Sequence, residues 1–195
     1  MARDKYRAAA IGASSGGLQA LTALLGRLPA DFPLALLIVQ HLGADSGDGL
    51  ARLLDQRCAL RVKEADEGEP IQPGTAYLAP PNYHLLVENA GTLALSVDPP
   101  VSYARPSIDV LFESAAMVFG PQLIGIVLTG ANADGSAGLA TIKDYGGLAV
   151  VQDPAEAESP PMPLAALAAT AVDHVLALQK IADLLLELAP SRQVR

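Results

Sequence analysis

The chain lacks the features that would tie it together covalently or place it within a membrane. Its single cysteine, Cys58, excludes an internal disulfide and fits a reducing, cytoplasmic environment. No apolar run reaches the length needed to span a bilayer. The short apolar stretch that follows Arg7 is a predicted strand, and not the core of a signal peptide. We therefore expect a cytoplasmic protein that is not embedded in a membrane.

Aromatic and basic residues are also scarce. Aromatic residues make up 4% of the sequence, so the core must be built mostly from Ala, Leu and Val. The 13 Lys and Arg are outnumbered by 21 Asp and Glu, and the net charge of −8 argues against a nucleic-acid partner. With 195 residues, 51% of them hydrophobic, the whole chain (1–195) is expected to form one domain.

What the chain does have is a glycine-bracketed pair of serines directly after its first apolar strand. Residues 8–13 form that strand, Gly12 to Gly17 form the turn, and an amphipathic run follows from Leu18 to Leu28. A strand, a tight turn and a helix are typical of a parallel α/β unit, whose sites lie at the carboxyl ends of the strands. The free N–H groups of the helix N-terminus can stabilise a negative charge. The turn therefore either presents a nucleophilic serine or cradles a phosphate.

Two sequence signatures and one structural role compete for this turn. Gly12-Ala13-Ser14-Ser15-Gly16 fits G-x-S-x-G, the nucleophile elbow of serine hydrolases. The same glycines, with Asn89-Ala90-Gly91 further on, resemble NAD(P)-binding short-chain dehydrogenases. Alternatively, the glycines only permit close helix packing. The nucleotide alternative is minor, because the next strand (34–39) ends in Gln40-His41, which does not suit a ribose, and no tyrosine has a lysine four positions later.

Two further strand ends supply a base and an acid. His41 follows the second strand, and sequential parallel strands tend to lie side by side, so it is placed to act as general base for Ser14. Another apolar strand (123–128) leads into a glycine-rich loop, where Asp134 can orient the imidazole. Asp134 is equally suited to cap the helix predicted from Ser136 onwards, and the sequence does not separate the two roles.

Two other histidines offer weaker alternatives. His84 lies in a block of short strands, where a structural role is favoured because a catalytic histidine needs a positioned partner. Asp173-His174 opens a late strand and keeps open a triad of Ser14, an aspartate and His174 in the commoner hydrolase order. No metal or cofactor is expected. The neighbours of the site are predicted to be Ser15, Gly16, Gln40, Thr129 and Asn132.

The order of these elements predicts an α/β fold. We expect a doubly wound, mainly parallel sheet with helices on both faces and an antiparallel hairpin at one edge. Ser107 is expected to cap a helix over 108–119. The edge block is expected to be antiparallel, with short strands at 60–65, 75–79, 83–87 and 92–96. The remaining expected elements are strands at 148–151 and 172–178 and helices at 164–169 and 181–188.

Several segments of the sequence, in order, resemble the catalytic domain of the chemotaxis protein-glutamate methylesterase, CheB. The resemblance covers essentially the whole chain, and no single motif carries it. The segments are 11–18 (IGASSGGL), 39–41 (VQH), 73–80 (PGTAYLAP), 105–112 (RPSIDVLF), 128–135 (LTG…DG), 146–153 (GG…VQD) and Met162-Pro163.

The resemblance implies a serine hydrolase with the triad Ser14, His41 and Asp134. Such an enzyme removes methyl esters from glutamyl side chains of chemoreceptors and deamidates glutamines through an acyl-enzyme, without a cofactor. The resemblance also implies a methylated chemoreceptor as partner and a substrate-side role for Arg105. Where the family has Met-Gly after Leu-Thr-Gly, this chain has Ala131-Asn132, in a loop that can lend a backbone N–H to the oxyanion. The alternative is a catalytically silent signalling or scaffold domain, which the presence of all three triad residues disfavours.

Typical members of the family also carry an N-terminal receiver domain. The first strand of this sequence begins near residue 8, so we expect either a stand-alone esterase or a trimmed chain, in both cases without a receiver domain. The expectation is an esterase that is active without phosphorylation. Any control would then come from a separate regulatory protein or from the receptor.

Overall fold

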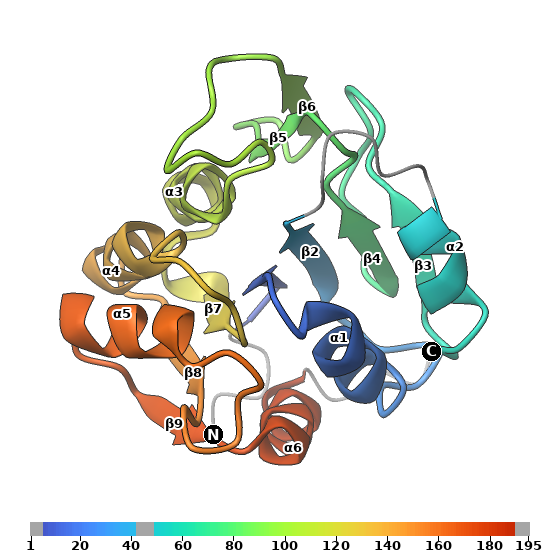
Figure 1. Cartoon of the computed structure of the whole chain (residues 1–195). Coiled ribbons are helices and arrows are strands. Elements are labelled where there is room, and N and C mark those ends of the chain that lie inside the picture. The colour runs from blue at the N-terminus through green and yellow to red at the C-terminus, as the bar shows by residue number, and fades with distance from the viewer. Residues whose placement is uncertain (1–5, 42–48, 190–195) are drawn as a thin grey trace.

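A seven-stranded parallel sheet runs through the centre of the molecule in the order β3-β4-β2-β1-β7-β8-β9 (Figure 1). The structure is a computed structural model that describes residues 6–41 and 49–189. The predicted doubly wound, mainly parallel α/β fold is confirmed. The strands are β1 (Ala8–Ala13), β2 (Ala35–Gln40), β3 (Arg61–Glu64), β4 (Thr75–Leu78), β7 (Leu123–Val127), β8 (Leu148–Gln152) and β9 (His174–Leu176).

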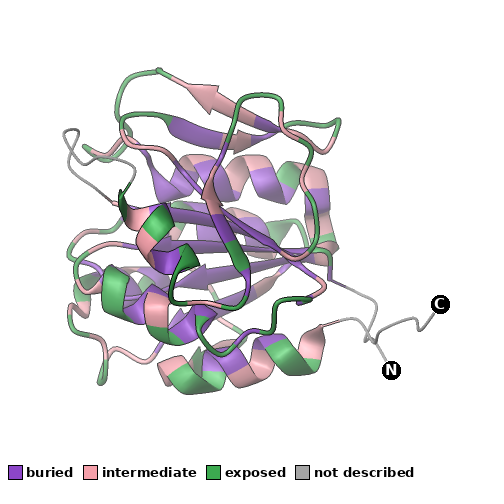
Figure 2. Ribbon diagram, turned by 90° about the vertical axis from the view of Figure 1, so that its right-hand side faces the viewer, coloured by how far each residue is buried: buried purple, intermediate pink, exposed green. Residues whose placement is uncertain are grey.

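Helices cover both faces of this sheet. The first face carries α1 (Gly17–Leu25), α2 (Gly49–Asp55) and α6 (Leu178–Leu188). The second carries α3 (Ile108–Phe119), α4 (Ser136–Asp144) and α5 (Pro161–Ala169), with the short 3-10 helix η1 (Gly120–Gln122) leading into β7. Every residue of β1, β2 and β7 is buried between the two layers (Figure 2). This double burial explains why these strands are continuous apolar runs instead of alternating ones.

The antiparallel hairpin is a sheet of its own. β5 (His84–Val87) pairs with β6 (Leu93–Ser96), and the hairpin packs against α3. The prediction that segments 60–65 and 75–79 are antiparallel is wrong, because β3 runs parallel to β4 and β4 runs parallel to β2. The connection that brings the chain from the end of β3 back to the start of β4 contains no helix. Parallel crossovers usually contain one, so the sequence between these strands does not indicate a parallel pair.

Helix and strand boundaries differ from the predicted ones at a few places. α1 ends at Leu25, before the end of the amphipathic run, with Gly26 as its C-cap. β9 is shorter than the predicted strand 172–178, and α6 begins at Leu178. Ser107 is the N-cap of α3, as predicted, and its side chain accepts a hydrogen bond from the N–H of Val110. Within the described ranges, none of the helices is both long and apolar enough to cross a bilayer.

β1 lies between β2 and β7, which is the arrangement that the site prediction requires. In the sheet register, Gly12 stands opposite Val39 on β2 and Val127 on β7. The residues that follow these three parallel strands therefore leave the sheet at the same carboxyl edge. They include Ser14, His41 and the loop that carries Asp134.

Candidate active site

Ser14 occupies the sharp turn between β1 and α1. Its backbone N–H donates to the carbonyl of Thr129 at 2.9 Å, and its carbonyl accepts from the N–H of Gly17 at 2.8 Å. Gly16 is the N-cap of α1 in the left-handed region, with φ 76°. A Cβ at Gly16 would also lie 2.8 Å from the Cβ of Glu158. Glycine is thus required here for both backbone and space, and the turn leaves Ser14 half-buried at the surface.

Gln40 fastens the Ser14 turn to the end of β2. Its buried side-chain amide donates from Nε2 to the carbonyl of Ser14 at 2.8 Å and to the carbonyl of His41 at 3.0 Å. One amide group therefore holds the backbones of the predicted nucleophile and the predicted base at a fixed spacing. Gln40 is predicted as a polar neighbour of the site, and the structure shows which groups it contacts there.

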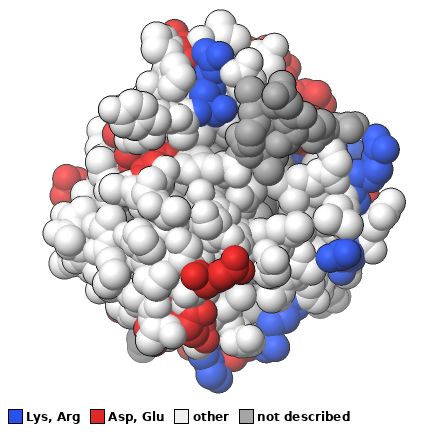
Figure 3. Space-filling model, viewed as in Figure 1, with Lys and Arg blue, Asp and Glu red and all other residues white. Residues whose placement is uncertain are grey.

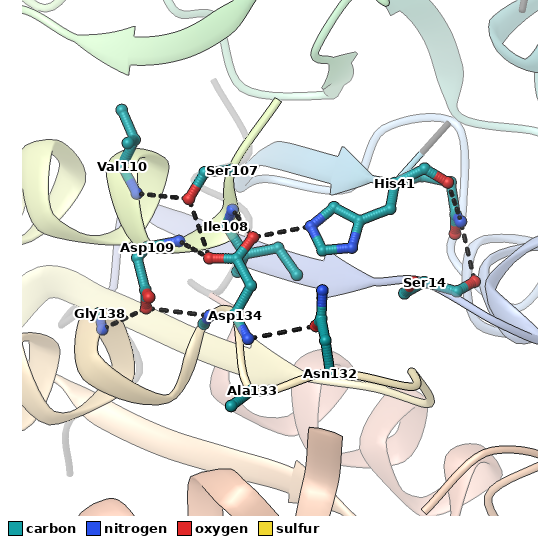
Figure 4. Close-up of polar contacts among 12 residues, drawn as sticks. Ser14, His41, Ser107, Ile108, Asp109, Val110, Asn132, Ala133, Asp134 and Gly138 are labelled. Carbon is teal, nitrogen blue, oxygen red and sulfur yellow. Dashed lines mark hydrogen bonds and ion pairs between the residues drawn. The ribbon is translucent and has the colours of Figure 1, made fainter. Parts of the chain in front are cut away.

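The imidazole of His41 contacts the carboxylate of Asp134. His41 Nε2 lies 2.7 Å from Asp134 Oδ2, and the two side chains are 13% and 0% exposed. Because a carboxylate only accepts hydrogen bonds, Nε2 carries the proton and Nδ1 is the nitrogen left for another partner. Figure 4 shows the imidazole between Asp134 and Ser14. The structure therefore places His41 in contact with Asp134, and it places Ser14 on the other side of the imidazole.

The first turn of α3 surrounds the carboxylate of Asp134 with donors. Ser107 Oγ donates at 2.9 Å, Ile108 N at 2.7 Å and Asp109 N at 3.0 Å (Figure 4). Burial alone raises the pKa of Asp134, but the hydrogen bonds from His41 and from α3 outweigh it, so the pKa lies below its ordinary value of 3.8. Asp134 is therefore held as an ionised acceptor. The N-cap of α4 is Gly135, so the alternative of Asp134 as the cap of that helix is wrong.

Asp109 is a second buried carboxylate beside Asp134. One oxygen, Oδ1, accepts hydrogen bonds from the N–H of Gly135 at 2.9 Å and from the N–H of Gly138 at 2.7 Å. Burial and the neighbouring charge of Asp134 raise the pKa of Asp109 to about 6, although the two glycine N–H groups oppose this shift. Asp109 thus fixes the start of α4, and α4 begins two residues after Asp134 in the chain.

Thr129 braces the other side of the serine turn. Its Oγ1 donates to the carbonyl of Ser15 at 2.8 Å and accepts from the N–H of Ser159 at 2.8 Å. Its backbone N–H donates to Oε1 of Gln152 at 2.9 Å. Thr129 was predicted as a polar neighbour, and these contacts place it behind the turn as a support.

The loop after β7 carries Ala131 and Asn132, the two departures from the family pattern. Asn132 Oδ1 accepts from the N–H of Asp134 at 3.2 Å, so its Nδ2 amide is free to face elsewhere. Ala131 and Ser15 are exposed. Among residues 6–41 and 49–189, no hydrogen bond is found for the backbone N–H of Ala131 or of Gly16. These N–H groups are available to a ligand.

Arg105 is engaged with the protein itself. Its Nη1 donates to the carbonyls of Val97 (2.7 Å) and Asp98 (3.0 Å), and its Nε and Nη2 donate to Oδ1 of Asn82. These bonds hold the loop that precedes α3. The predicted contact of Arg105 with a substrate stays a prediction.

His174 is remote from the serine turn. It begins β9, which is separated from β1 by β7 and β8, so the lateral distance is about 14 Å at ordinary strand spacing. It also stands at the amino end of its strand, whereas Ser14 follows the carboxyl end of β1. Its neighbour Asp173 is paired with Lys143 at 2.8 Å. The alternative triad through His174 is therefore wrong.

Sequence reasoning missed two contributors and understated a third. Asp109 and Gln152 were not singled out, and Ser107 was predicted only as a helix cap. Ser107 and Asp109 do lie in the segment RPSIDVLF that carried part of the family resemblance. Their contacts depend on α3 lying beside α4, which no local pattern encodes.

Among the described residues, the surface around the site carries little charge. The carboxyl ends of β1, β2 and β7 lie near the middle of Figure 1, and the same region is mostly uncharged in Figure 3. Acidic and basic groups lie mainly toward the rim of this face, apart from one acidic group near the centre. The acidic groups of the described residues are therefore not concentrated over the site.

Comparisons with known proteins agree with this geometry. A family model described as CheB methylesterase matches residues 9–185. A protein-glutamate methylesterase/protein-glutamine glutaminase from Methanosarcina mazei is 42% identical over 181 residues, but this chain spans only 49% of that relative. A Leptospira interrogans protein whose name gives the same two activities provisionally is 51% identical over 183 residues, which cover 94% of this chain and 95% of the relative.

A solved structure is also similar. The crystal structure of the Thermotoga maritima CheB methylesterase catalytic domain matches with a TM-score of 0.91 and 32% sequence identity. The match covers 94% of this chain and 99% of that domain. The chain therefore belongs to the CheB methylesterase family.

Proposed function

We propose that the protein is a serine hydrolase that removes methyl esters from glutamyl side chains of chemoreceptors. The observation that carries the proposal is the 2.7 Å contact between His41 Nε2 and the buried carboxylate of Asp134, formed beside the Ser14 turn. A positioned base and its orienting acid next to a serine that reaches the surface are the parts that acyl transfer needs. The names of the relatives supply the substrate class.

The acylation step uses the free ring nitrogen of His41. Ser14 Oγ attacks the ester carbonyl while Nδ1 of His41 takes the hydroxyl proton. Nε2–H stays bonded to Asp134, whose negative charge stabilises the imidazolium. When the tetrahedral intermediate collapses, the C–O bond to the methoxy group breaks. The leaving methoxide takes the proton from Nδ1 and departs as methanol.

Deacylation repeats the sequence with water. His41 deprotonates a water molecule that attacks the acyl-enzyme, and the proton then returns to Ser14 Oγ as the glutamate carboxylate leaves. A glutamine side chain enters the same acyl-enzyme with ammonia as the leaving group. Both reactions therefore use one set of residues, and neither step requires a cofactor.

The oxyanion requires donors that are already in place. The backbone N–H groups of Gly16 and Ala131 are the candidates, and Gly16 adds the positive end of the α1 dipole. The side-chain amide of Asn132 is a third candidate, because Oδ1 is already bonded to the N–H of Asp134. Ala131 in place of the family's methionine leaves the backbone donor intact.

The test is methanol release from the cytoplasmic fragment of a chemoreceptor that carries radiolabelled methyl esters. We expect Ser14→Ala and His41→Ala each to lose activity by about a thousandfold or more while remaining folded. His174→Ala is the matched control for the histidine change and should keep wild-type turnover. Full activity in Ser14→Ala would point to a different nucleophile, and no methanol release from the wild-type protein would favour a silent scaffold domain.

A further inference from the structure

His84 is a buried histidine that the proposed chemistry does not use. It opens β5 of the hairpin, and only 1% of its surface is exposed. Both ring nitrogens have hydrogen-bond partners. Nδ1 lies 3.2 Å from the backbone N of Ser107, and Nε2 lies 3.2 Å from the carbonyl oxygen of Pro99.

These two partners allow a single protonation state of the ring. A backbone N–H only donates, so Nδ1 must be the acceptor without a proton. A carbonyl only accepts, so Nε2 must carry the proton. His84 is therefore a neutral imidazole, and a proton on Nδ1 would break the bond to Ser107.

Ser107 connects His84 to Asp134. His84 holds the backbone N–H of Ser107, and Oγ of the same serine donates to Asp134 Oδ1 at 2.9 Å. The next two backbone N–H groups, of Ile108 and Asp109, also donate to Asp134. A shift of Ser107 would move this whole set of donors, and with it the carboxylate that contacts His41.

The other ring nitrogen holds the loop before α3. Arg105 binds the carbonyls of Val97 and Asp98, and His84 binds the next carbonyl, that of Pro99. The loop carries Tyr103, whose side chain is fully exposed. His84 thus joins an exposed loop on one side to the support of Asp134 on the other.

We propose that His84 is a positioning residue for the esterase reaction. Through Ser107 it fixes Asp134 and thereby the imidazole of His41, and through Pro99 it fixes the loop 97–105. The kinetic part of this proposal rests on the proposed function. The observation that favours positioning over a purely structural role is the link from His84 through Ser107 to Asp134.

Two substitutions test the roles of the two ring nitrogens of His84 separately. Asn at position 84 carries an oxygen where Nδ1 stands, so His84→Asn keeps an acceptor for the N–H of Ser107 and loses the bond to Pro99. Gln extends an amide toward the position of Nε2, so His84→Gln keeps the donor to Pro99 and leaves the N–H of Ser107 unpaired. Thermal unfolding of both variants establishes that they fold, and His174→Gln is the control for a histidine change outside this network.

We expect His84→Gln to lower kcat about tenfold at nearly unchanged KM, because an unpaired buried donor displaces the support of Asp134. We expect His84→Asn to keep kcat within about twofold and to raise KM, because the loop is released while the triad is held. Equal kcat losses in the two variants at equal thermal stability, or wild-type kcat in His84→Gln, would overturn the proposal. If His84→Gln does not fold, a tenfold kcat loss in His84→Asn would refute it and a retained kcat with raised KM would support it.

A second readout does not depend on turnover. In ¹⁵N NMR spectra of the histidine rings, we expect the Nε2 resonance of His41 to shift in His84→Gln and to stay in place in His84→Asn. If the wild-type protein lacks esterase activity, the proposed function fails, yet this comparison still decides whether His84 positions His41. Unchanged His41 resonances in His84→Gln would contradict the positioning role.

Discussion

Asp134 binds the first turn of α3, the helix that carries Asp109, and Asp109 binds the start of α4, the helix that follows Asp134. Asp134, just before α4, accepts hydrogen bonds from Ser107, Ile108 and Asp109 at the start of α3, whereas Asp109 accepts from Gly135 and Gly138 at the start of α4. The two helices are therefore locked together at the point where the predicted acid of the triad is needed. The two carboxyl groups titrate differently, because the pKa of Asp134 is lowered below 3.8 and that of Asp109 is raised to about 6.

Asp134→Asn should abolish most of the activity without unfolding the protein. The amide at this position can turn its NH2 group toward the donors of α3, which loses hydrogen bonds there. It can instead turn its NH2 group toward His41, and Nε2 must then accept, so that the imidazole adopts the wrong tautomer. We expect kcat to fall about a thousandfold or more. Methanol release, with circular dichroism as the check on folding, measures the effect. Activity within tenfold of wild type would show that His41 does not need this carboxylate.

Asp109→Asn should remove a pH dependence of stability. The ordinary pKa of the carboxyl is 3.8 and the folded value is about 6, so in this window the folded state binds a proton that the unfolded state has lost. Wild-type stability from this group therefore falls as the pH rises from 3.8 through about 6, and stays low above it. Asn keeps an oxygen for Gly135 and Gly138 and adds a donor for Asp134, so the variant should lack this slope. At pH 7 it should be more stable by on the order of 3 kcal/mol.

Denaturant unfolding of both proteins between pH 4 and pH 7 tests this prediction. The contribution of Asp134 has the opposite sign, because its lowered pKa means that stability is lost only as the pH falls below 3.8. The two effects therefore occupy different pH windows. A parallel pH profile in wild type and Asp109→Asn would show that folding does not raise the pKa of Asp109.

Gly17→Ala should destabilise the serine turn through Gln40. A Cβ at position 17 would lie 2.8 Å from Cδ of Gln40 and closer still to its Oε1. Gln40 cannot move aside freely, because its Nε2 holds the carbonyls of Ser14 and His41. We expect Gly17→Ala to cost about 1–3 kcal/mol of stability and to lower kcat. In a Gln40→Ala background the same change should cost less, and additive costs in this double-mutant cycle would contradict the explanation.

No dinucleotide should bind at the glycine turn. The side chain of Glu158 lies against Gly16, so a pyrophosphate at the N-terminus of α1 would meet a carboxylate. Gln40, at the end of β2, is already bonded to the backbone of the site. Calorimetric titration with NAD and NADP should give no saturable heat. Saturable binding that is lost on Gly16→Val would restore the nucleotide interpretation.

The sequence by itself determined the central part of the fold and the residues of the candidate triad. Three continuous apolar runs predicted β1, β2 and β7, because strands buried on both faces need no alternation. Ser14, His41 and Asp134 were found because each follows one of these strands, and parallel strands end at the same edge. The catalytic roles of these residues remain predictions, but their proximity follows from local pattern and the rules of parallel sheets.

The tertiary structure decided what surrounds those residues. The parallel pairing of β3 with β4 arises from a crossover without a helix, which leaves no periodicity to recognise. The support of Asp134 by Ser107, and of Ser107 by His84, joins segments that are 27 and 23 residues apart in the chain. Such contacts exist only after α3 has packed between the hairpin and α4, because hydrogen bonds between distant segments depend on how whole elements pack and not on the residues next to them in sequence.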